Sequence, residues 1–355
     1  MIYIIMPAYN AEKTIEYAIK SVQKQTYKDW ILIIVNDGSA DSTSDIINSY
    51  TKNDDRIVHL KQKNFGQFVA RRNGVQYAKS ISNVDDYVCF LDADDSFTSS
   101  ALEKMYSVAK KDNIDILCAG YQKVYSNKNP RVVFGSKPHI MDEICYENDD
   151  ILGKLYINFY SGGQVDYALW AKLFEINIIH KAFEYNNFPQ RYAEDLVVDL
   201  IAFSNAKSVK LINEVVYNYS KGGLTEQFMP TFFSDICIVD SVRSECIKRL
   251  DLPNDFTKAS KYQFMNLMLS YLERCIHQYN MSVFDLQIIF KELIDDFQAI
   301  ELFNYESQSK NELFKSFSLA MLDKNFELAY SIVDDIIPPN SFKARAKRLL
   351  GKFKK

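Results

Sequence analysis

The feature that most constrains the fold is an alternation of apolar runs and amphipathic segments along residues 1–124. Short runs such as MIYIIM, WILIIV and YVCFL contain no charged residue. Between them lie segments whose apolar residues have helical spacing, for example Ile15, Ala18, Ile19 and Val22. Continuous apolar strands that alternate with helices are typical of a mostly parallel sheet with helices on both faces. The sequence therefore predicts a first domain of the α/β, Rossmann-like class.

The pattern changes after about residue 225. Long segments such as ASKYQFMNLMLSYLERCIHQY have helical periodicity and are no longer separated by strand-like runs. We expect an α/β domain over residues 1–225, an α-helical add-on domain over residues 226–338 and a separate tail over residues 339–355. A length of 355 residues agrees with more than one domain.

Charge is unevenly distributed along the chain. The net charge is −4, yet the last fifteen residues, SFKARAKRLLGKFKK, carry seven Lys and Arg and no acid. An acidic body with a short basic tail is not typical of a nucleic-acid-binding protein, so no nucleic acid is expected as a partner. In the tail, helical spacing places several apolar residues on one face: Phe342, Ala346, Leu349, Leu350 and Phe353. The tail is either a peripheral helix on an anionic membrane or a disordered, solubilising extension.

The cysteines and the hydropathy indicate a compartment. None of the six cysteines forms a C-x-x-C pair, which is typical of small core residues in a reducing environment. No apolar stretch reaches the roughly 18 residues that a spanning helix needs. The start, MIYIIMPAYN, lacks the basic region of a signal peptide and is expected to be a strand. We expect a cytoplasmic protein, with peripheral contact to the inner membrane face under one interpretation of the tail.

Polar loops follow four of the expected strands, and one of them is strongly acidic. PAYN, NDGSADS, NFGQ and DADD come at strand carboxyl ends, where open parallel sheets bind ligands. In DADD, Asp92, Asp94 and Asp95 repel one another unless a cation compensates them, and carboxylate oxygens suit Mg²⁺ or Mn²⁺. The alternative is a solvated turn in which Asp95 or Ser96 caps the next helix. Three acids after a buried strand favour the metal.

Four motifs in register resemble a known family. IIMPAYNAEKTIEYAIKSVQKQTY, ILIIVNDGSADST, NFGQFVARRNG and YVCFLDADD occur in the order and at the spacing of family 2 glycosyltransferases with the GT-A fold. The resemblance covers residues 1–125 closely and continues more loosely to about residue 225. It implies a GT-A first domain and a UDP-sugar donor. It also implies nucleotide-binding roles for the uracil-binding Asp37, the base-stacking Tyr9, and the backbone of Pro7 and Ala8.

The resemblance also covers the NFGQFVARRNG segment, which follows the third expected strand, and the residues that would bind the metal. Arg71 matches an arginine that approaches the nucleotide, and Asn64 and Gly66 would shape the loop. Arg72 stands where the family often has Asn, and we interpret it as a surface charge rather than a second anion contact. Asp92 and Asp94 match the D-x-D pair, with Asp94 as direct ligand of Mn²⁺ or Mg²⁺ and Asp92 on the ribose or on the metal through water. The ion would neutralise the departing diphosphate.

The catalytic base is expected in RYAEDLVVDL. Inverting transfer needs a base for the acceptor hydroxyl, and by the resemblance Asp195 is that base, with Glu194 as a supporting or acceptor contact. The alternative is that both acids only favour a helix N-terminus. Trp170 either stacks on a sugar or is buried. Gly162 and Gly163 suggest a flexible loop, and Lys221 a phosphate contact.

These inferences together predict a metal-dependent, inverting transferase. It would move one galactose, glucose or N-acetylglucosamine from a UDP-sugar to a lipid-linked or protein-linked glycan acceptor of a surface polysaccharide precursor or glycoprotein. Processive members carry Gln-x-x-Arg-Trp after the base and membrane spans, and this sequence has neither, so a single addition is expected. The alternative is a metal-dependent phosphohydrolase that uses the DADD carboxylates, which leaves the NDGS loop unexplained.

Overall fold

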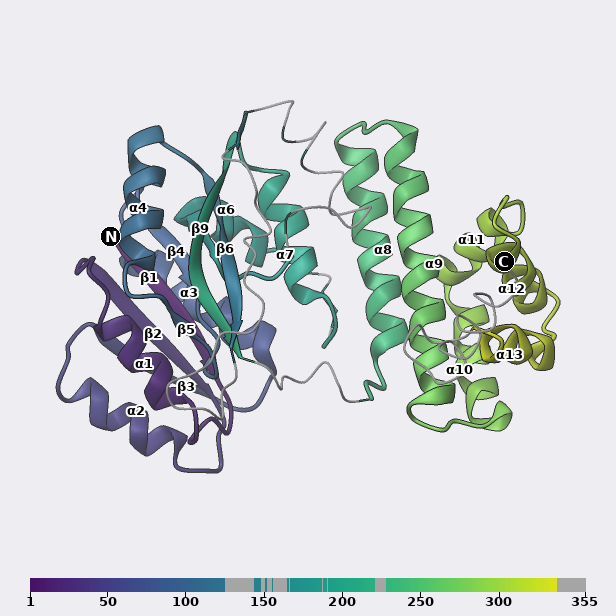
Figure 1. Ribbon diagram of the computed structural model, residues 1–355, viewed down its shortest axis with the longest axis horizontal. Coiled ribbons are helices and arrows are strands. Elements are labelled where there is room, and N and C mark those ends of the chain that lie inside the picture. Colours follow the sequence, from purple (N-terminus) through teal and green to yellow (C-terminus); the bar gives the residue numbers. More distant parts are fainter. Residues whose placement is uncertain are drawn as a thin grey trace, which may run out of the picture. The chain divides into compact units, whose positions relative to one another are not determined.

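The computed structural model describes residues 1–124, 144–147, 151, 155, 165, 167–186, 188–189, 191–220 and 228–336 (Figure 1). The chain divides into two units, one of Met1–Gln227 with Lys248–Leu252 and one of Phe228–Ile247 with Pro253–Lys355. Three expectations lie outside the described residues: the loop at Gly162 and Gly163, the phosphate contact of Lys221 and the tail over residues 339–355.

The first unit is built on one mixed sheet. Its strand order is β3-β2-β1-β4-β8-β6-β9-β5, with β7 paired to β9, and β3, β2, β1 and β4 are parallel neighbours. β8 runs antiparallel to both of its neighbours, whereas β6 and β9 are parallel. The strands are β1 (Ile2–Ala8), β2 (Trp30–Asp37), β3 (Ile57–Gln62), β4 (Tyr87–Phe90), β5 (Ser96–Phe97), β6 (Ile116–Val124), β7 (Ile144–Glu147), β8 (Lys172–Glu175) and β9 (Ser208–Ser220).

Helices cover both faces of this sheet, as successive side chains of β1 show. Ile4 belongs to the same core cluster as Ile15 and Ile19 of α1, whereas Ile5 faces α3. A Cβ at Gly74 of α3 would come within 2.5 Å of Ile5 Cγ2, so this glycine lets the helix lie close to the sheet. The helices are α1 (Ile15–Gln23), α2 (Thr43–Thr51), α3 (Gln67–Ile81), α4 (Ala101–Asp112), α6 (Ile176–Phe183) and α7 (Glu194–Phe203).

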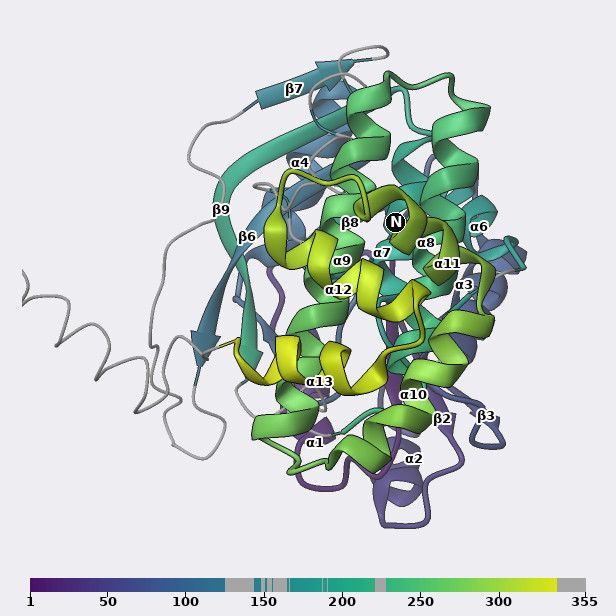
Figure 2. The ribbon, with the colours of Figure 1, turned by 90° about the vertical axis from the view of Figure 1, so that its right-hand side faces the viewer.

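The second unit is α-helical in its described residues, and α11 and α13 pack against α9 (Figure 2). Local sequence sets where its helices begin: Ser282 forms a capping box with Asp285, and Asp296, Asn311 and Asn325 accept backbone N–H groups at three further starts. The helices are α8 (Phe232–Arg249), α9 (Asn254–His277), α10 (Val283–Asp295), α11 (Phe297–Glu306), α12 (Glu312–Leu322) and α13 (Phe326–Asp334). Among the described residues, no helix has the length and hydropathy to cross a membrane.

The expected fold class is confirmed: strands and helices alternate along residues 1–124, and a helical region follows. The alternative for DADD as a helix cap is wrong, because Ser96 lies in β5 and α4 begins only at Ala101. Four strands, β5, β7, β8 and β9, were not predicted from the pattern. β5 has two residues, and β7 and β8 have four each, which is too short for a periodicity. β9 is longer, but buried and exposed residues do not alternate regularly along it.

Candidate active site

The nucleotide-side residues lie where the parallel strands end. Pro7 and Ala8 are the last residues of β1 and are buried. Tyr9 follows them with 52% of its surface exposed, which leaves its ring open to stacking. Asn64 is exposed in the loop after β3. The sheet therefore brings these residues to one edge, as expected of loops at the carboxyl ends of parallel strands.

Asp37 is buried at the end of β2 and holds the loop after β3. Its Oδ1 accepts hydrogen bonds from Gln62 Nε2 and Phe65 N, both at 2.8 Å, and its Oδ2 accepts from Gly66 N at 2.9 Å. A carboxylate has about four acceptor sites, so three of them serve the loop. Gly66 has φ of +92° at the start of α3, a conformation that favours glycine. The loop-shaping bonds of Asp37 were not expected from the sequence.

The DADD turn is anchored by β9. Tyr217 Oη donates to Asp95 Oδ2 at 2.8 Å and accepts from Asp92 N at 3.1 Å. Ser220 donates from its backbone N to Asp95 Oδ1 at 2.7 Å and from its Oγ to the carbonyl oxygen of Asp94, also at 2.7 Å. Burial, and then the charges of Asp92 and Asp94, raise the pKa of Asp95 to about 8. Asp95 therefore supports the turn, while Asp92 and Asp94 remain half-buried.

One guanidinium joins the turn to the expected base. Arg71, only 2% exposed, places Nη2 at 2.9 Å from Asp92 Oδ1 and Nη1 at 2.6 Å from Asp195 Oδ1. The same Nη1 lies 3.6 Å from Glu194 Oε1. Gln67, one helical turn earlier on α3, donates to Asp92 Oδ1 at 3.2 Å. One carboxylate of the DADD turn and two at the start of α7 thus surround Arg71, which the resemblance assigned to the nucleotide.

The acid pair begins α7 in an environment that disfavours charge. Burial, and then the neighbouring Asp195, raise the pKa of Glu194 to about 8. Burial also raises the pKa of Asp195, and Arg71 opposes that rise. The second oxygen of Asp195 accepts from Leu169 N at 3.4 Å. A half-buried carboxylate with a raised pKa beside the cations Arg71 and Lys172 can act as a proton acceptor, which the helix-terminus alternative does not require.

Trp170 belongs to an aromatic cluster. Its ring stacks on Tyr217 with centroids 5.1 Å apart and meets Tyr121 edge-on at 4.5 Å. The side chain is half-buried and packs against the core of the first unit. Packing in this cluster thus explains why Trp170 is aromatic without a role in sugar binding. Part of its side chain is nevertheless exposed.

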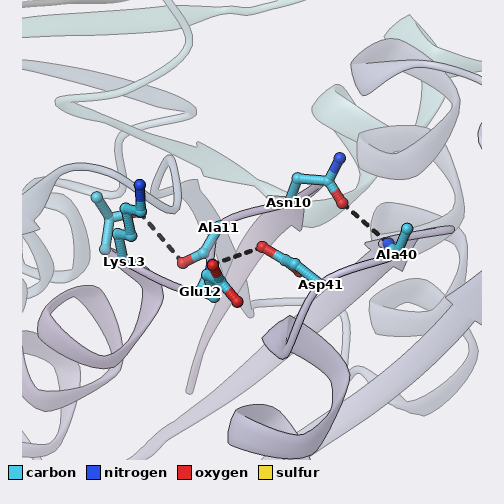
Figure 3. A pocket seen from close by; sticks show the side chains of 7 residues that line it. Asn10, Ala11, Glu12, Lys13, Ala40 and Asp41 are labelled. Carbon is cyan, nitrogen blue, oxygen red and sulfur yellow. Dashed lines mark hydrogen bonds between the residues drawn. The ribbon is translucent and has the colours of Figure 1, made fainter.

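A surface pocket of about 590 Å³ lies beside the loops that follow β1 and β2 (Figure 3). Asn10 Oδ1 accepts from Ala40 N at 2.9 Å, and Asp41 Oδ2 accepts from Glu12 N at 3.1 Å. Ala11, Lys13 and Thr14 complete the lining, and none of the expected site residues takes part. The pocket is a product of loop packing next to Tyr9.

The metal expectation can be compared with the available donors. Within the described residues, no group of three His, Cys, Asp or Glu is arranged to hold an ion. Both oxygens of Asp95 are engaged by β9, which leaves Asp92 and Asp94 as the carboxylates of the turn. Mg²⁺ and similar ions are commonly bound by one or two carboxylates together with substrate phosphates and water. The donor set therefore fits an ion shared with a diphosphate.

The structure brings Arg71, Asp92, Glu194 and Asp195 into one cluster and places Tyr9 and Asp37 along the same sheet edge. Sequence reasoning missed Gln67, Leu169, Tyr217 and Ser220. Gln67 could have been found from its helical spacing to Arg71. The other three have no local signal, because their contacts depend on how β8 and β9 enter the sheet.

Comparisons with known sequences find similarity to glycosyltransferases. The Glycosyl transferase family 2 profile matches residues 3–167. A cholesterol galactosyltransferase of Borreliella burgdorferi is 30% identical over 62% of this chain and 60% of its own. The UDP-Glc:alpha-D-GlcNAc-diphosphoundecaprenol beta-1,3-glucosyltransferase WfgD of Escherichia coli is 35% identical over 36% of this chain and 48% of its own.

A solved structure extends the likeness of the fold beyond the family match. S. aureus TarS, residues 1–349, in complex with UDP-GlcNAc, has a TM-score of 0.70 at 18% identity, covering 94% of this chain and 90% of that one. Among curated relatives the coverage is smaller: the chain spans between 38% and 63% of the length of three of them. The fold is thus shared over nearly the whole chain.

Proposed function

We propose that this chain, whose residues 3–167 match the Glycosyl transferase family 2 profile, is a member of that family and transfers one hexosyl residue from a UDP-sugar to a glycan acceptor. The reaction is inverting and depends on a divalent metal ion. The sugar is galactose, glucose or N-acetylglucosamine, and the acceptor is a lipid-linked precursor of a surface polysaccharide. The names of WfgD and of the TarS complex support a UDP-sugar donor, and WfgD supports a lipid diphosphate acceptor.

One observation carries the proposal: Arg71 contacts Asp92 of the DADD turn and Asp195 of α7, at 2.9 Å and 2.6 Å. These two carboxylates are 103 positions apart in the sequence and belong to the two halves of the reaction. Asp92 lies on the donor side and Asp195 on the acceptor side. Because both carboxylates contact one buried guanidinium, the anomeric carbon of a bound donor sugar would lie within reach of both sides.

The donor side binds the nucleotide and its phosphates. Tyr9 stacks on the base, and the loop that Asp37 holds in place forms the wall beside it. Asp94 and Asp92 would hold Mn²⁺ or Mg²⁺, which supplies charge neutralisation of the diphosphate when it is bound. Asp95 keeps the turn in register through Tyr217 and Ser220.

Proton transfer takes place on the acceptor side of the site, at Asp195. The acceptor hydroxyl oxygen forms a bond to the anomeric carbon while the bond from that carbon to the diphosphate oxygen breaks. Asp195 accepts the hydroxyl proton, and the diphosphate leaves with the electron pair of the broken bond. Attack opposite to the leaving group inverts the configuration. Arg71 keeps Asp195 oriented and favours its ionised form.

A UDP-release assay tests the proposal. The protein is incubated with each of the three UDP-sugars, Mn²⁺ and a GlcNAc-diphosphoundecaprenol analogue, and one donor is expected to give acceptor-dependent UDP release. Asp195→Asn should lower kcat by about 10²- to 10⁴-fold, the usual contribution of a general base, with UDP binding retained. Asp94→Ala should weaken UDP binding with Mn²⁺ and much less so in EDTA, as measured by calorimetry.

Asp255→Asn is the matched control, because Asp255 is also an acid in the first turn of a helix and is exposed. It should leave kcat unchanged. Wild-type kcat in Asp195→Asn, or an equal loss in Asp255→Asn, would contradict the assignment of the base. Phosphomonoester hydrolysis without turnover of any UDP-sugar would instead support the phosphohydrolase.

A further inference from the structure

A buried ion pair lies one helical turn beyond the base. Lys172 Nζ is 2.7 Å from Asp199 Oδ2, and the two residues are 3% and 0% exposed. Asp199 follows Asp195 by four positions on α7, so the two carboxylates lie on the same side of that helix. Neither the motifs nor the reaction described above accounts for this pair.

Lys172 makes a second contact, to the segment in front of its own strand. Its ammonium also donates to the carbonyl oxygen of Ala168 at 2.7 Å. The next residue, Leu169, donates its backbone N–H to Asp195 Oδ2. The segment of residues 168–171 is therefore joined to α7 at two successive levels, by Leu169 to Asp195 and by Lys172 to Asp199.

The backbone of this segment needs such support. Ala171 has φ of +57°, a left-handed conformation that costs an L-residue other than glycine about 1–3 kcal/mol and persists only where the surroundings fix it. On one side the sheet fixes it, because Ala119 N donates to the carbonyl oxygen of Ala171 at 2.8 Å. On the other side the Lys172 ammonium holds Ala168. With Ala171 in this conformation, both the Leu169 N–H and the Lys172 ammonium contact α7.

Stability alone is a weak reason for this pair. Buried ion pairs commonly gain little over well-packed apolar side chains of the same volume, because both charges lose their hydration. An apolar pair, however, has no donor for the carbonyl oxygen of Ala168. What Lys172 adds is a hydrogen bond that fixes backbone next to the base.

From these contacts we infer that Lys172 and Asp199 are positioning residues for the catalytic base: they hold residues 168–171 against α7 so that the Leu169 N–H orients Asp195. The inference rests on the proposed function for the role of Asp195. It concerns a contact that can also be measured without turnover.

The test replaces the pair by apolar residues of similar volume, Lys172→Met with Asp199→Leu. The double variant avoids the lone buried charge that a single substitution leaves. We expect folding and UDP binding to be retained, and kcat to fall by about 10- to 100-fold, the scale of a misplaced reacting group. KM for the donor should change little. Amide exchange at residues 168–171 should become faster, as measured by mass spectrometry.

The matched control is Lys261→Met with Asp240→Leu. That pair is equally buried, with Nζ 2.9 Å from Oδ2, but both residues belong to the second unit. It should change neither kcat nor exchange at residues 168–171. Wild-type kcat or unchanged exchange in the Lys172/Asp199 double variant would overturn the inference and leave the pair a purely structural one.

Two further outcomes can be told apart: a wild type without turnover, and a double variant that does not fold. If the wild type turns over no UDP-sugar, the proposed function fails, while the exchange measurement still decides whether the pair holds the segment. If the double variant does not fold, exchange in the wild type decides: the Leu169 amide must be protected at least about 10²-fold relative to a free peptide, because opening it requires local unfolding. Free-peptide exchange at Leu169 would overturn the inference.

Discussion

Both units bury a lysine–aspartate pair and a tyrosine whose hydroxyl bridges two groups, and only their neighbours differ. In the second unit, Lys261 of α9 pairs with Asp240 of α8, and Tyr271 Oη accepts from Met229 N and donates to its carbonyl oxygen. In the first unit, Lys172 contacts Asp199 of α7, the helix that carries the base, and Tyr217 contacts Asp95 of the DADD turn. The same kinds of buried contact therefore support helix packing in the second unit and orient acids in the first.

The two units differ in how many cations face their buried acids. In the second unit, Asp240 is matched by Lys261, and Ser260 Oγ donates to its other oxygen at 3.1 Å. In the first unit, the single guanidinium of Arg71 faces three carboxylates. A crowd of acids with one cation is poorly compensated by the protein alone. Such an excess is typical of sites that bind a cation or move a proton.

The largest effect on stability is expected when each lysine–aspartate pair is broken by a single substitution. Asp199→Ala and Asp240→Ala each leave a buried lysine without its partner aspartate, which costs about 3–5 kcal/mol of unfolding free energy. Urea denaturation followed by circular dichroism measures the loss. The comparison predicts similar costs in stability, with a fall in kcat of the folded protein only for Asp199→Ala. A fall of kcat as large in Asp240→Ala would remove the distinction between the units.

A pH titration of stability sharpens the contrast in charge balance. Glu194 and Asp95 have pKa values of about 8 in the folded protein, whereas carboxyls of an unfolded chain titrate near pH 4. Between these values the folded state binds more protons, so the unfolding free energy of the first unit should fall as pH rises. The scale is about 1.4 kcal/mol for each pKa unit.

Thermal melts in EDTA at pH 5.5 and pH 8 provide the measurement. The melting temperature of the first unit should be lower at pH 8, and Glu194→Gln should flatten that dependence because one of the groups with a raised pKa no longer titrates. A first unit that is equally stable at pH 5.5 and pH 8, or more stable at pH 8, would contradict the raised pKa values of these acids.

The two tyrosines allow a smaller and more selective perturbation. Tyr217→Phe and Tyr271→Phe each remove a buried bridging hydroxyl and should cost about 1–3 kcal/mol. Only Tyr217→Phe removes a donor to Asp95 and an acceptor for Asp92 N. We therefore expect weaker UDP binding with Mn²⁺ in Tyr217→Phe and unchanged binding in Tyr271→Phe. Calorimetry of both variants checks this, and equal affinities would contradict it.

The smallest expected effect concerns two left-handed residues. Ala171 in the first unit and Lys324 in the second have φ of +57° and +55°. Glycine adopts this conformation without steric cost but is more flexible in the unfolded chain, so Ala171→Gly and Lys324→Gly should each raise the unfolding free energy by at most about 1 kcal/mol. Melting temperatures measure the gain. Only Ala171→Gly should also lower kcat, because it loosens the segment beside the base.

Much of the fold and part of the site follow from local patterns. Uninterrupted apolar runs predicted the parallel strands, because a strand covered on both faces has no polar side. Polar loops after those strands predicted the edge where Tyr9, Asp37 and Asp92 lie. Two-residue β5 and four-residue β8 carry too little periodicity to be recognised, and both enter the sheet only through pairing with distant strands.

The sequence by itself thus determined which residue types stand at the ends of which strands, since alternation and helical spacing are properties of neighbouring residues. Only the tertiary structure decided which of them meet. Arg71 turns to Asp92 and Asp195 rather than to open solvent, Asp37 binds the loop after β3, and Tyr217 reaches Asp95 across 122 positions. Such contacts depend on strand order and on where β9 crosses the sheet, and no local periodicity encodes either of these.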